Sequence, residues 1–274
     1  MHDTDAPAPY LLHNGELIDP TLPVVSISNG ALLYGQGIFE TLAVYHGIPF
    51  AAEAHYKRLS RGASQLSLKI PSLTELMENV DRIVKANQLC QFEKSRLRIT
   101  VTTEGCSITT STILSHSESA KVTTVPFVRN ERGALAGLKT VNYGENVVAM
   151  RHAHEAGADE SLFGNTRDNL CEGTWSNIFV LARDQWITPP LDSGCLPGVT
   201  REILLNLAGT GHPRIEEANL PLSDLDQVEA AFLTSSIREI QPVTAINGRM
   251  IDSLNRPEID HWMRAYREFV ITKE

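Results

Sequence analysis

The chain has 274 residues, enough for one large domain or two of ordinary size, and its 42% hydrophobic and 21% charged residues exclude a disordered protein. Its 24 basic and 33 acidic residues give a net charge of −9, which argues against nucleic acid as the main partner because phosphate backbones bind basic surfaces. We therefore expect an acidic, soluble, globular protein.

Residues 1–127 are predicted to form a smaller N-terminal α+β domain. Asn14-Gly15 is a strong hairpin-turn signal, and Ser72 with Glu75 forms a capping box at the start of a helix. The expected elements are a hairpin over 10–18, a short strand over 24–28, a strand over 38–45, a helix over 52–67, a helix from 72 onward, and strands over 96–103 and 122–127.

Residues 128–137 are polar and contain glycine, and they are predicted to form the inter-domain linker. Residues 138–274 are predicted to form a C-terminal α/β domain. Its expected elements are a strand near 138–141, a helix over 145–158, a hairpin from 160–163 to 176–181, a helix just past 198, a strand over 229–235 and a final amphipathic helix. Two domains of similar size often hold a site between them, so we expect the active site in the inter-domain cleft.

The four cysteines have neither the CxxC spacing of a zinc site nor the pattern of a small disulfide-rich domain. They are expected to be reduced thiols, and no metal site is expected. The first residues are acidic and contain prolines, unlike a signal peptide, and no apolar run is long enough to span a membrane. We expect a cytoplasmic protein that contacts no membrane. The cysteines are Cys90, Cys106, Cys171 and Cys195.

Familiar catalytic motifs are missing from the sequence. GQGIFE lacks the third glycine of a dinucleotide fingerprint, and no phosphate loop, GxSxG elbow or HExxH pair occurs. His152 and His154 are two residues apart on a predicted helix, so they point in different directions and do not form a metal pair. The chemistry must therefore come from residues scattered along the chain.

Five short motifs contain residues suited to chemistry: HYKRL with Arg58, GLKTVNY with Lys139, CEGTWSN with Glu172, LPGVTR, and LTSSIREIQPV. Each motif alone has an ordinary interpretation. Lys139 could be a surface lysine, Glu172 a solvated hairpin carboxylate, and Arg58 an ion-pair partner on a helix surface. LPGVTR carries a signal of its own, because Gly198 frees the backbone where a helix begins, and helix N-termini bind phosphate.

In this order, from YGQGIFETL to IREIQPV, the motifs resemble the fold-type IV enzymes that use pyridoxal 5′-phosphate (PLP). That superfamily includes branched-chain aminotransferases, D-amino-acid aminotransferases and aminodeoxychorismate lyases. The resemblance implies a two-domain α+β fold with the active site in the cleft between the domains. It also implies a PLP cofactor, a small-molecule substrate and a homodimer whose sites lie near the subunit boundary.

The resemblance also assigns roles to individual residues. Lys139 becomes the Schiff-base lysine and the acid/base that moves the substrate α-proton. Glu172, in the ExxxxN pattern that ends at Asn177, pairs with the pyridine nitrogen and keeps it protonated. Tyr143 contacts the phenolic oxygen of the cofactor, and Tyr34 and Phe39 belong to the substrate pocket. The phosphate donors implied by the match are Arg58, Val199, Thr200, Ser235 and Ser236.

The subgroup depends on contacts to the substrate carboxylate. Many D-amino-acid aminotransferases have an Arg-x-His pair in a loop that here reads TTEGCSITTSTILSH, without arginine. Branched-chain enzymes usually show FEGIR and GTAAE, whereas this chain has FETLA and TSSIRE, and Trp175 stands where smaller residues are usual. The FETL and TSSxxE forms are more similar to aminodeoxychorismate lyase, which eliminates pyruvate from 4-amino-4-deoxychorismate to give 4-aminobenzoate for folate synthesis. The alternatives are a class IV aminotransferase of D-amino-acid or branched-chain type, and a non-catalytic binding protein that keeps the fold.

Overall fold

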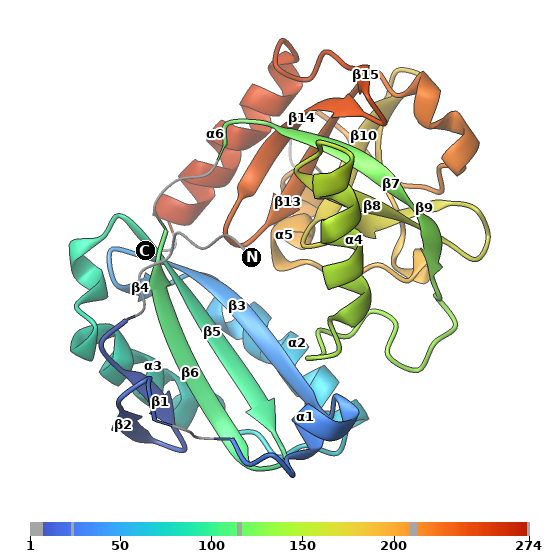
Figure 1. Cartoon of the computed structure of the whole chain (residues 1–274). Coiled ribbons are helices and arrows are strands. Elements are labelled where there is room, and N and C mark those ends of the chain that lie inside the picture. The colour runs from blue at the N-terminus through green and yellow to red at the C-terminus, as the bar shows by residue number, and fades with distance from the viewer. Residues whose placement is uncertain (1–7, 23–24, 114–116, 209–212, 273–274) are drawn as a thin grey trace. The chain divides into compact units, whose positions relative to one another are not determined.

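The computed structural model describes residues 8–22, 25–113, 117–208 and 213–272. The chain divides into two compact units (Figure 1). Unit 1 consists of residues 1–116 with 138–142 and 273–274, and unit 2 consists of residues 117–137 and 143–272. Both units combine helices with a sheet, so the predicted α+β class is confirmed.

Unit 1 is built on a six-stranded antiparallel sheet in the order β2-β1-β6-β5-β3-β4. Asn14 and Gly15 both have positive φ, as a two-residue hairpin turn requires, so the predicted first hairpin is confirmed. The described residues 25–28 form a bend and a turn, so the strand expected there is wrong. The elements are β1 (Leu11–His13), β2 (Glu16–Ile18), α1 (Gly30–Tyr34), β3 (Gly37–Tyr45), β4 (Ile48–Pro49), α2 (Ala52–Gln65), α3 (Leu73–Ala86), β5 (Lys94–Thr102) and β6 (Gly105–Thr112).

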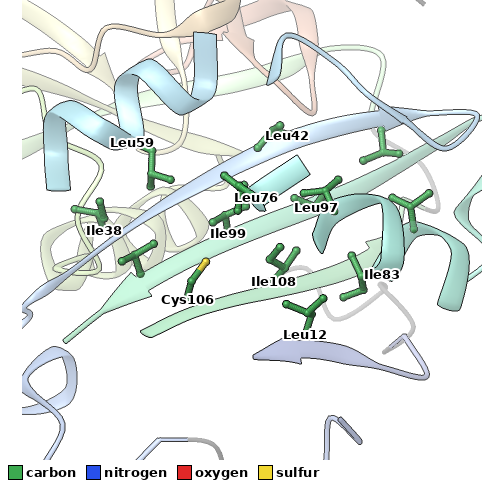
Figure 2. Packing of buried hydrophobic residues seen from close by; sticks show 14 of the residues in the cluster. Leu12, Ile38, Leu42, Leu59, Leu76, Ile83, Leu97, Ile99, Cys106 and Ile108 are labelled. Atoms are coloured by element: carbon green, nitrogen blue, oxygen red, sulfur yellow. The ribbon is translucent and has the colours of Figure 1, made fainter. Parts of the chain in front are cut away.

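The core of unit 1 forms where α2 and α3 cover one face of this sheet (Figure 2). Alternate residues of β5 are buried, and α3 buries Leu76, Val80, Ile83 and Val84, which lie on one face of the helix. The Ser72 hydroxyl accepts a hydrogen bond from the backbone N–H of Glu75 at 3.2 Å, so the predicted helix start is confirmed. This packed layer fixes the positions of β3 and α2, which carry several of the site residues.

Residues 138–142 belong to unit 1 although they lie outside its main stretch of chain. The N–H of Phe39 donates to the carbonyl of Lys139, and the N–H of Val141 donates to the carbonyl of Gly37, both at 2.9 Å. The segment therefore runs along the edge of β3, and Thr140 bridges to Ile38. Lys139 thus belongs to unit 1, whereas the sequence analysis assigned it to the C-terminal domain.

Unit 2 contains a nine-stranded mixed sheet in the order β12-β11-β10-β13-β14-β7-β8-β9, with β15 beside β14. The pairs β14/β7, β7/β8 and β11/β12 are parallel. The elements are β7 (Ala120–Arg129), α4 (Gly144–Glu155), β8 (Glu160–Asn165), β9 (Leu170–Gly173), β10 (Asn177–Ala182), β11 (Gln185–Thr188), α5 (Val199–Ala208), β12 (Ile215–Glu217), β13 (Ala230–Ser235), β14 (Glu239–Ile246), β15 (Arg249–Met250) and α6 (Pro257–Ile271).

The strand β7 corrects the predicted domain boundaries of 127 and 138. Residues 122–127 were predicted to end the first domain and residues 128–129 to lie in the linker, but β7 pairs with β14 and β8 of unit 2. Parallel partners far apart in the sequence leave no local signal, which is why chain order gave the wrong boundary. The remaining residues, 130–137, contain turns.

The core of unit 2 lies on both faces of its sheet. One face buries aliphatic residues of β7, β10, β13 and β14. The other face carries an aromatic cluster. The rings of Phe179 and Phe232 stack with centroids 4.7 Å apart, and Trp186 and Trp262 pack beside Phe232. Among the described residues, the helices are all too short or too polar to cross a membrane.

Candidate active site

Lys139 lies on the short segment that pairs with β3 in unit 1. The antiparallel bridge between Ile38 and Thr140 sets Lys139 opposite Phe39, and opposite partners share one face of a sheet. Lys139 Nζ lies 4.5 Å from the centroid of the Phe39 ring, and the guanidinium carbon of Arg98 lies 3.7 Å from the same centroid. The buried ring thus contacts two cations, which together favour an anionic group nearby.

Arg58 takes part in a buried cluster with Glu40 and His55. Arg58 Nε and Nη2 donate to the two carboxylate oxygens of Glu40, each at 2.7 Å, and His55 Nδ1 lies 2.7 Å from Glu40 Oε2. His55 and Arg58 are three residues apart on α2, so both face β3. The Arg58 side chain is only 9% exposed, so the interpretation as a helix-surface residue is wrong.

Burial and charge fix the protonation states in this cluster. Burial alone would raise the pKa of Glu40, but the charge of Arg58 and hydrogen bonds from Arg58 and His55 hold that pKa well below its usual range. Burial lowers the pKa of His55, and the charges of Arg58 and Lys139 lower it further against the opposing effect of Glu40. At neutral pH the cluster therefore contains a carboxylate, a guanidinium and a neutral imidazole that donates from Nδ1.

The lowered pKa of His55 predicts a loss of stability on acidification. The unfolded chain protonates His55 near pH 6.5, whereas the folded chain does so only at lower pH, so stability falls as the pH drops below about 6.5. Denaturant unfolding at a series of pH values should show this fall in the wild type and a flatter profile in His55→Gln. Exposed His154→Gln should keep the wild-type profile, and equal profiles in all three proteins would contradict the assignment.

Glu172 lies at the end of β9 in unit 2 and is nearly buried, so it is not a solvated hairpin carboxylate. Its Oε2 accepts the backbone N–H of Leu196 at 2.8 Å, and its Oε1 lies 3.4 Å from Arg129 Nε. The Arg129 guanidinium also lies 4.0 Å from the centroid of the Phe163 ring. The carboxylate is therefore held in one orientation by a backbone donor and a cation.

Two buried thiols lie near Glu172. Burial, with the charge of Glu172, raises the pKa of Cys171 far above its usual value and that of Cys195 to about 11. Both thiols therefore stay protonated at neutral pH. All four cysteines are free in the structure, as the sequence analysis expected.

Val199 and Thr200 are the first residues of α5, and both are buried. The predicted start of this helix is confirmed. A Cβ atom at Gly198 would lie 2.0 Å from Asn177 Oδ1, so only glycine permits this close approach. Asn177 Nδ2 donates to the carbonyl of Leu196 at 2.8 Å. The two ends of the ExxxxN motif, Glu172 and Asn177, therefore both hold Leu196, three residues before the helix start.

Ser235 and Ser236 lie where β13 ends, and both are half-buried. Thr234 pairs with Asn177 across β13 and β10. The turn that begins with Ser235 and Ser236, here called the serine turn, therefore starts next to Asn177. The Ser235 hydroxyl accepts the backbone N–H of Arg238 at 3.1 Å. Within unit 2, Asn177 therefore contacts both segments: it pairs with Thr234, which precedes the serine turn, and it donates to Leu196, which precedes α5 by three residues.

The three predicted tyrosine and phenylalanine contacts have different surroundings. Tyr143 directly precedes α4, and its ring packs against that of Trp175 with centroids 5.1 Å apart. Trp175 is 41% exposed. Tyr34 ends α1 and is exposed, whereas Phe39 is buried beneath Lys139 and Arg98.

The structure thus gathers the predicted residues in two groups, one in each unit. Unit 1 brings together Lys139, Phe39 and the Arg58 cluster, and unit 2 brings together Glu172, the start of α5 and the serine turn. Sequence reasoning missed Glu40 as the partner of Arg58, and it missed Arg98 and Arg129. Glu40 is part of FETL, but nothing in that motif indicated its pairing with Arg58. No motif contained Arg98 or Arg129. The partners of all three come from other strands or helices, so no local pattern reveals them.

The residues present fit the PLP that the sequence resemblance implies. Glu172 offers a fixed carboxylate for a protonated ring nitrogen, and the start of α5 offers backbone N–H groups beside the buried Thr200 hydroxyl. The absence of a side chain at Gly198 leaves the backbone close to Asn177. Lys139 supplies an amine, and Arg58 supplies a guanidinium for a phosphate.

Comparisons with known proteins identify the family of the chain. The profile of the family Amino-transferase class IV matches residues 37–246. A Methanocaldococcus jannaschii protein provisionally named branched-chain-amino-acid aminotransferase is 28% identical over 95% of this chain and 96% of its own length. The aminodeoxychorismate lyase of Bacillus subtilis is 28% identical over 85% of each chain. A fold IV-transaminase from Curtobacterium pusillum, 26% identical, has a TM-score of 0.82 over 93% of this chain and 97% of its own.

The family match spans most of the chain and includes the segments that carry both groups of site residues. Class IV aminotransferases and aminodeoxychorismate lyases use PLP, so the predicted cofactor is confirmed. The alternative of a non-catalytic binding protein is not supported, because the relatives are enzymes. The chain belongs to the class IV aminotransferase family and is a PLP-dependent enzyme.

Proposed function

We propose that the protein is an aminodeoxychorismate lyase, which converts 4-amino-4-deoxychorismate into 4-aminobenzoate and pyruvate. The observation that carries this proposal is the turn between β5 and β6, residues 103–104, whose only charged side chain is the carboxylate of Glu104. The described part of β6 adds no arginine or histidine. A simple amino acid would need a cation there to hold its carboxylate, and misplacement by an ångström costs about a hundredfold in rate.

In this proposal Lys139 moves the proton at the substrate α-carbon. PLP, when bound, supplies an electron sink for the charge left on that carbon. Lys139 Nζ takes the proton, because its backbone is fixed to β3 and its side chain is directed across Phe39. Glu172 holds a proton at the ring nitrogen, since Leu196 N–H and Arg129 keep its carboxylate in place.

Arg58, the start of α5 and the serine turn are proposed to bind the phosphate, and Tyr143 to contact the phenolic oxygen. We further propose that Tyr34 and Phe39 border the substrate. The resemblance also supports a homodimer and a role in folate synthesis, and we propose a cytoplasmic location from the reduced cysteines. In each lyase cycle Lys139 would take the α-proton, the bond from the β-carbon to the ether oxygen would break, and the side chain would leave as enolpyruvate, which takes up a proton to become pyruvate while the ring becomes aromatic.

The reaction itself is the direct test. The protein with PLP and 4-amino-4-deoxychorismate should release pyruvate and 4-aminobenzoate in equal amounts without any keto acid. With D-alanine or L-branched-chain amino acids, conversion of the cofactor to pyridoxamine phosphate should be slow. Rapid, stoichiometric conversion by either amino acid, with no pyruvate from aminodeoxychorismate, would assign the protein to the aminotransferases instead.

The second candidate is therefore an aminotransferase, and one observation favours it. Arg98 and Lys139 contact the same ring, so a cation lies near the amine and could hold a substrate carboxylate on unit 1 itself. The relatives named as branched-chain and D-alanine aminotransferases also support it. Arg98→Met should then weaken the keto acid half-reaction more than the lyase reaction.

A further inference from the structure

Glu160, the first residue of β8, is a carboxylate with no exposed surface. Its Oε1 accepts the backbone N–H of Trp175 at 2.6 Å and the hydroxyl of Ser176 at 2.8 Å. Its Oε2 pairs with the guanidinium of Arg238, whose side chain is 12% exposed. A single buried carboxylate thus has three partners in two separate segments of unit 2.

Those two segments are the ones proposed to hold opposite ends of the cofactor. Trp175 and Ser176 lie inside the ExxxxN motif, between Glu172 and Asn177. Arg238 lies in the turn after the two serines, and its backbone N–H donates to Ser235 Oγ at 3.1 Å. The pair between Glu160 and Arg238 therefore connects the segment of the ring-nitrogen carboxylate to the segment of the phosphate serines.

The chain packs tightly around this pair. A Cβ atom at Gly173 would lie 2.5 Å from Glu160 Oε1 and 2.3 Å from Ser176 Oγ. The backbone at Gly173 therefore lies so close to the carboxylate that no side chain fits there. Burying both charges costs desolvation energy, and apolar residues of similar volume often give equal or better stability. The ion pair contributes geometric specificity, because a guanidinium and a carboxylate fix each other's orientation.

We propose that Glu160 and Arg238 are positioning residues, which set the Ser235–Ser236 turn relative to Glu172 so that one PLP molecule reaches both. The inference rests on the proposed phosphate and ring-nitrogen assignments. It does not depend on whether the reaction is elimination or transamination. Neither residue needs to touch the cofactor, since each acts through the segment that it holds.

The test compares PLP with pyridoxal, which lacks the phosphate. Titration of the apo-protein gives a dissociation constant for each, and their ratio measures the phosphate contribution. Arg238→Met should lower the preference for PLP about tenfold or more while leaving pyridoxal affinity close to that of the wild type, because losing one hydrogen bond to a charged group changes affinity by about this much. Arg238→Lys should recover part of the preference, since it keeps the charge.

Two further variants keep the test decisive if Arg238→Met folds poorly. Glu160→Gln/Arg238→Met buries no net charge and keeps an acceptor for Trp175 and Ser176, so its apo-protein should melt near the wild-type temperature and still show the lowered preference. Arg183→Met removes an exposed ion pair with Asp224 in the same unit and should change nothing.

Ser235→Ala separates failure of this inference from failure of the site assignment. If Ser235→Ala lowers the preference for PLP and the Arg238 variants do not, the positioning role is overturned while the phosphate assignment stands. If none of them lowers it, both are overturned. An equal loss of affinity for PLP and pyridoxal in Glu160→Gln/Arg238→Met would show a general structural role and would also overturn the proposal.

Discussion

Replacing Lys139 with alanine is expected to abolish nearly all turnover, with a fall in kcat of at least about 10²-fold, because proton transfer by a positioned side chain alone contributes about 10²–10⁴-fold. The fold should survive. The hydrogen bonds that hold the segment to β3 use the backbone of residues 139 and 141, and alanine keeps them. The change therefore removes the amine, its contact with the Phe39 ring and its charge near His55, and it keeps the backbone pairing with β3.

Borohydride reduction of the wild-type enzyme, followed by peptide mapping, checks the same residue without a substrate. The reduced cofactor should be found on Lys139 and should be absent from Lys139→Ala. Lys121→Ala, which changes an exposed lysine of β7, is the matched control and should keep both the adduct and the activity. An adduct on any other lysine would refute the assignment of Lys139.

Features that depend on neighbouring residues could be predicted from the sequence. The hairpin at Asn14-Gly15 follows from two adjacent residues that tolerate positive φ, and the start of α3 follows from one hydroxyl three residues before its partner. The start of α5 just past Gly198 belongs to the same class. In each case the interaction that decides the structure lies within a few residues of the motif.

Features that depend on distant partners could not be predicted. Residues 122–127 form part of a strand, as predicted, but the partners of that strand, β14 and β8, are set by packing of the whole unit. Glu40 was visible as part of FETL, yet nothing local reveals that it accepts two hydrogen bonds from Arg58, 18 residues away. Arg129 was assigned to a linker because its segment is polar, although it lies beside Glu172.

The family resemblance supplied what local patterns could not, since it selected Lys139, Glu172 and Arg58 by their order along the chain. It did not supply the surroundings that decide how each residue behaves. A buried Arg58 that pairs with Glu40 raises a question about its role, because the same side chain is proposed to bind phosphate. Structural and cofactor-binding roles make different predictions for a set of three variants.

Arg58→Met should destabilise the protein by about 3–5 kcal/mol, because it leaves the Glu40 carboxylate buried without its cation. In Glu40→Gln/Arg58→Met no charge remains in the pair, so most of that stability should return. Glu40→Gln alone keeps the guanidinium and weakens only the pair. Urea unfolding of the three apo-proteins, with the wild type beside them, measures these differences.

Cofactor affinity should follow a different order from stability. If Arg58 also binds the phosphate, both variants that lack it lose a charge-assisted hydrogen bond of about 1.5–3 kcal/mol, roughly a 10- to 150-fold rise in the dissociation constant for PLP. Glu40→Gln keeps the guanidinium and should bind PLP more tightly than either. The double variant is decisive, since it restores the fold without restoring the donor. If the double variant binds PLP as tightly as the wild type, the role of Arg58 is only to pair with Glu40. The start of α5 and the serine turn alone would then bind the phosphate.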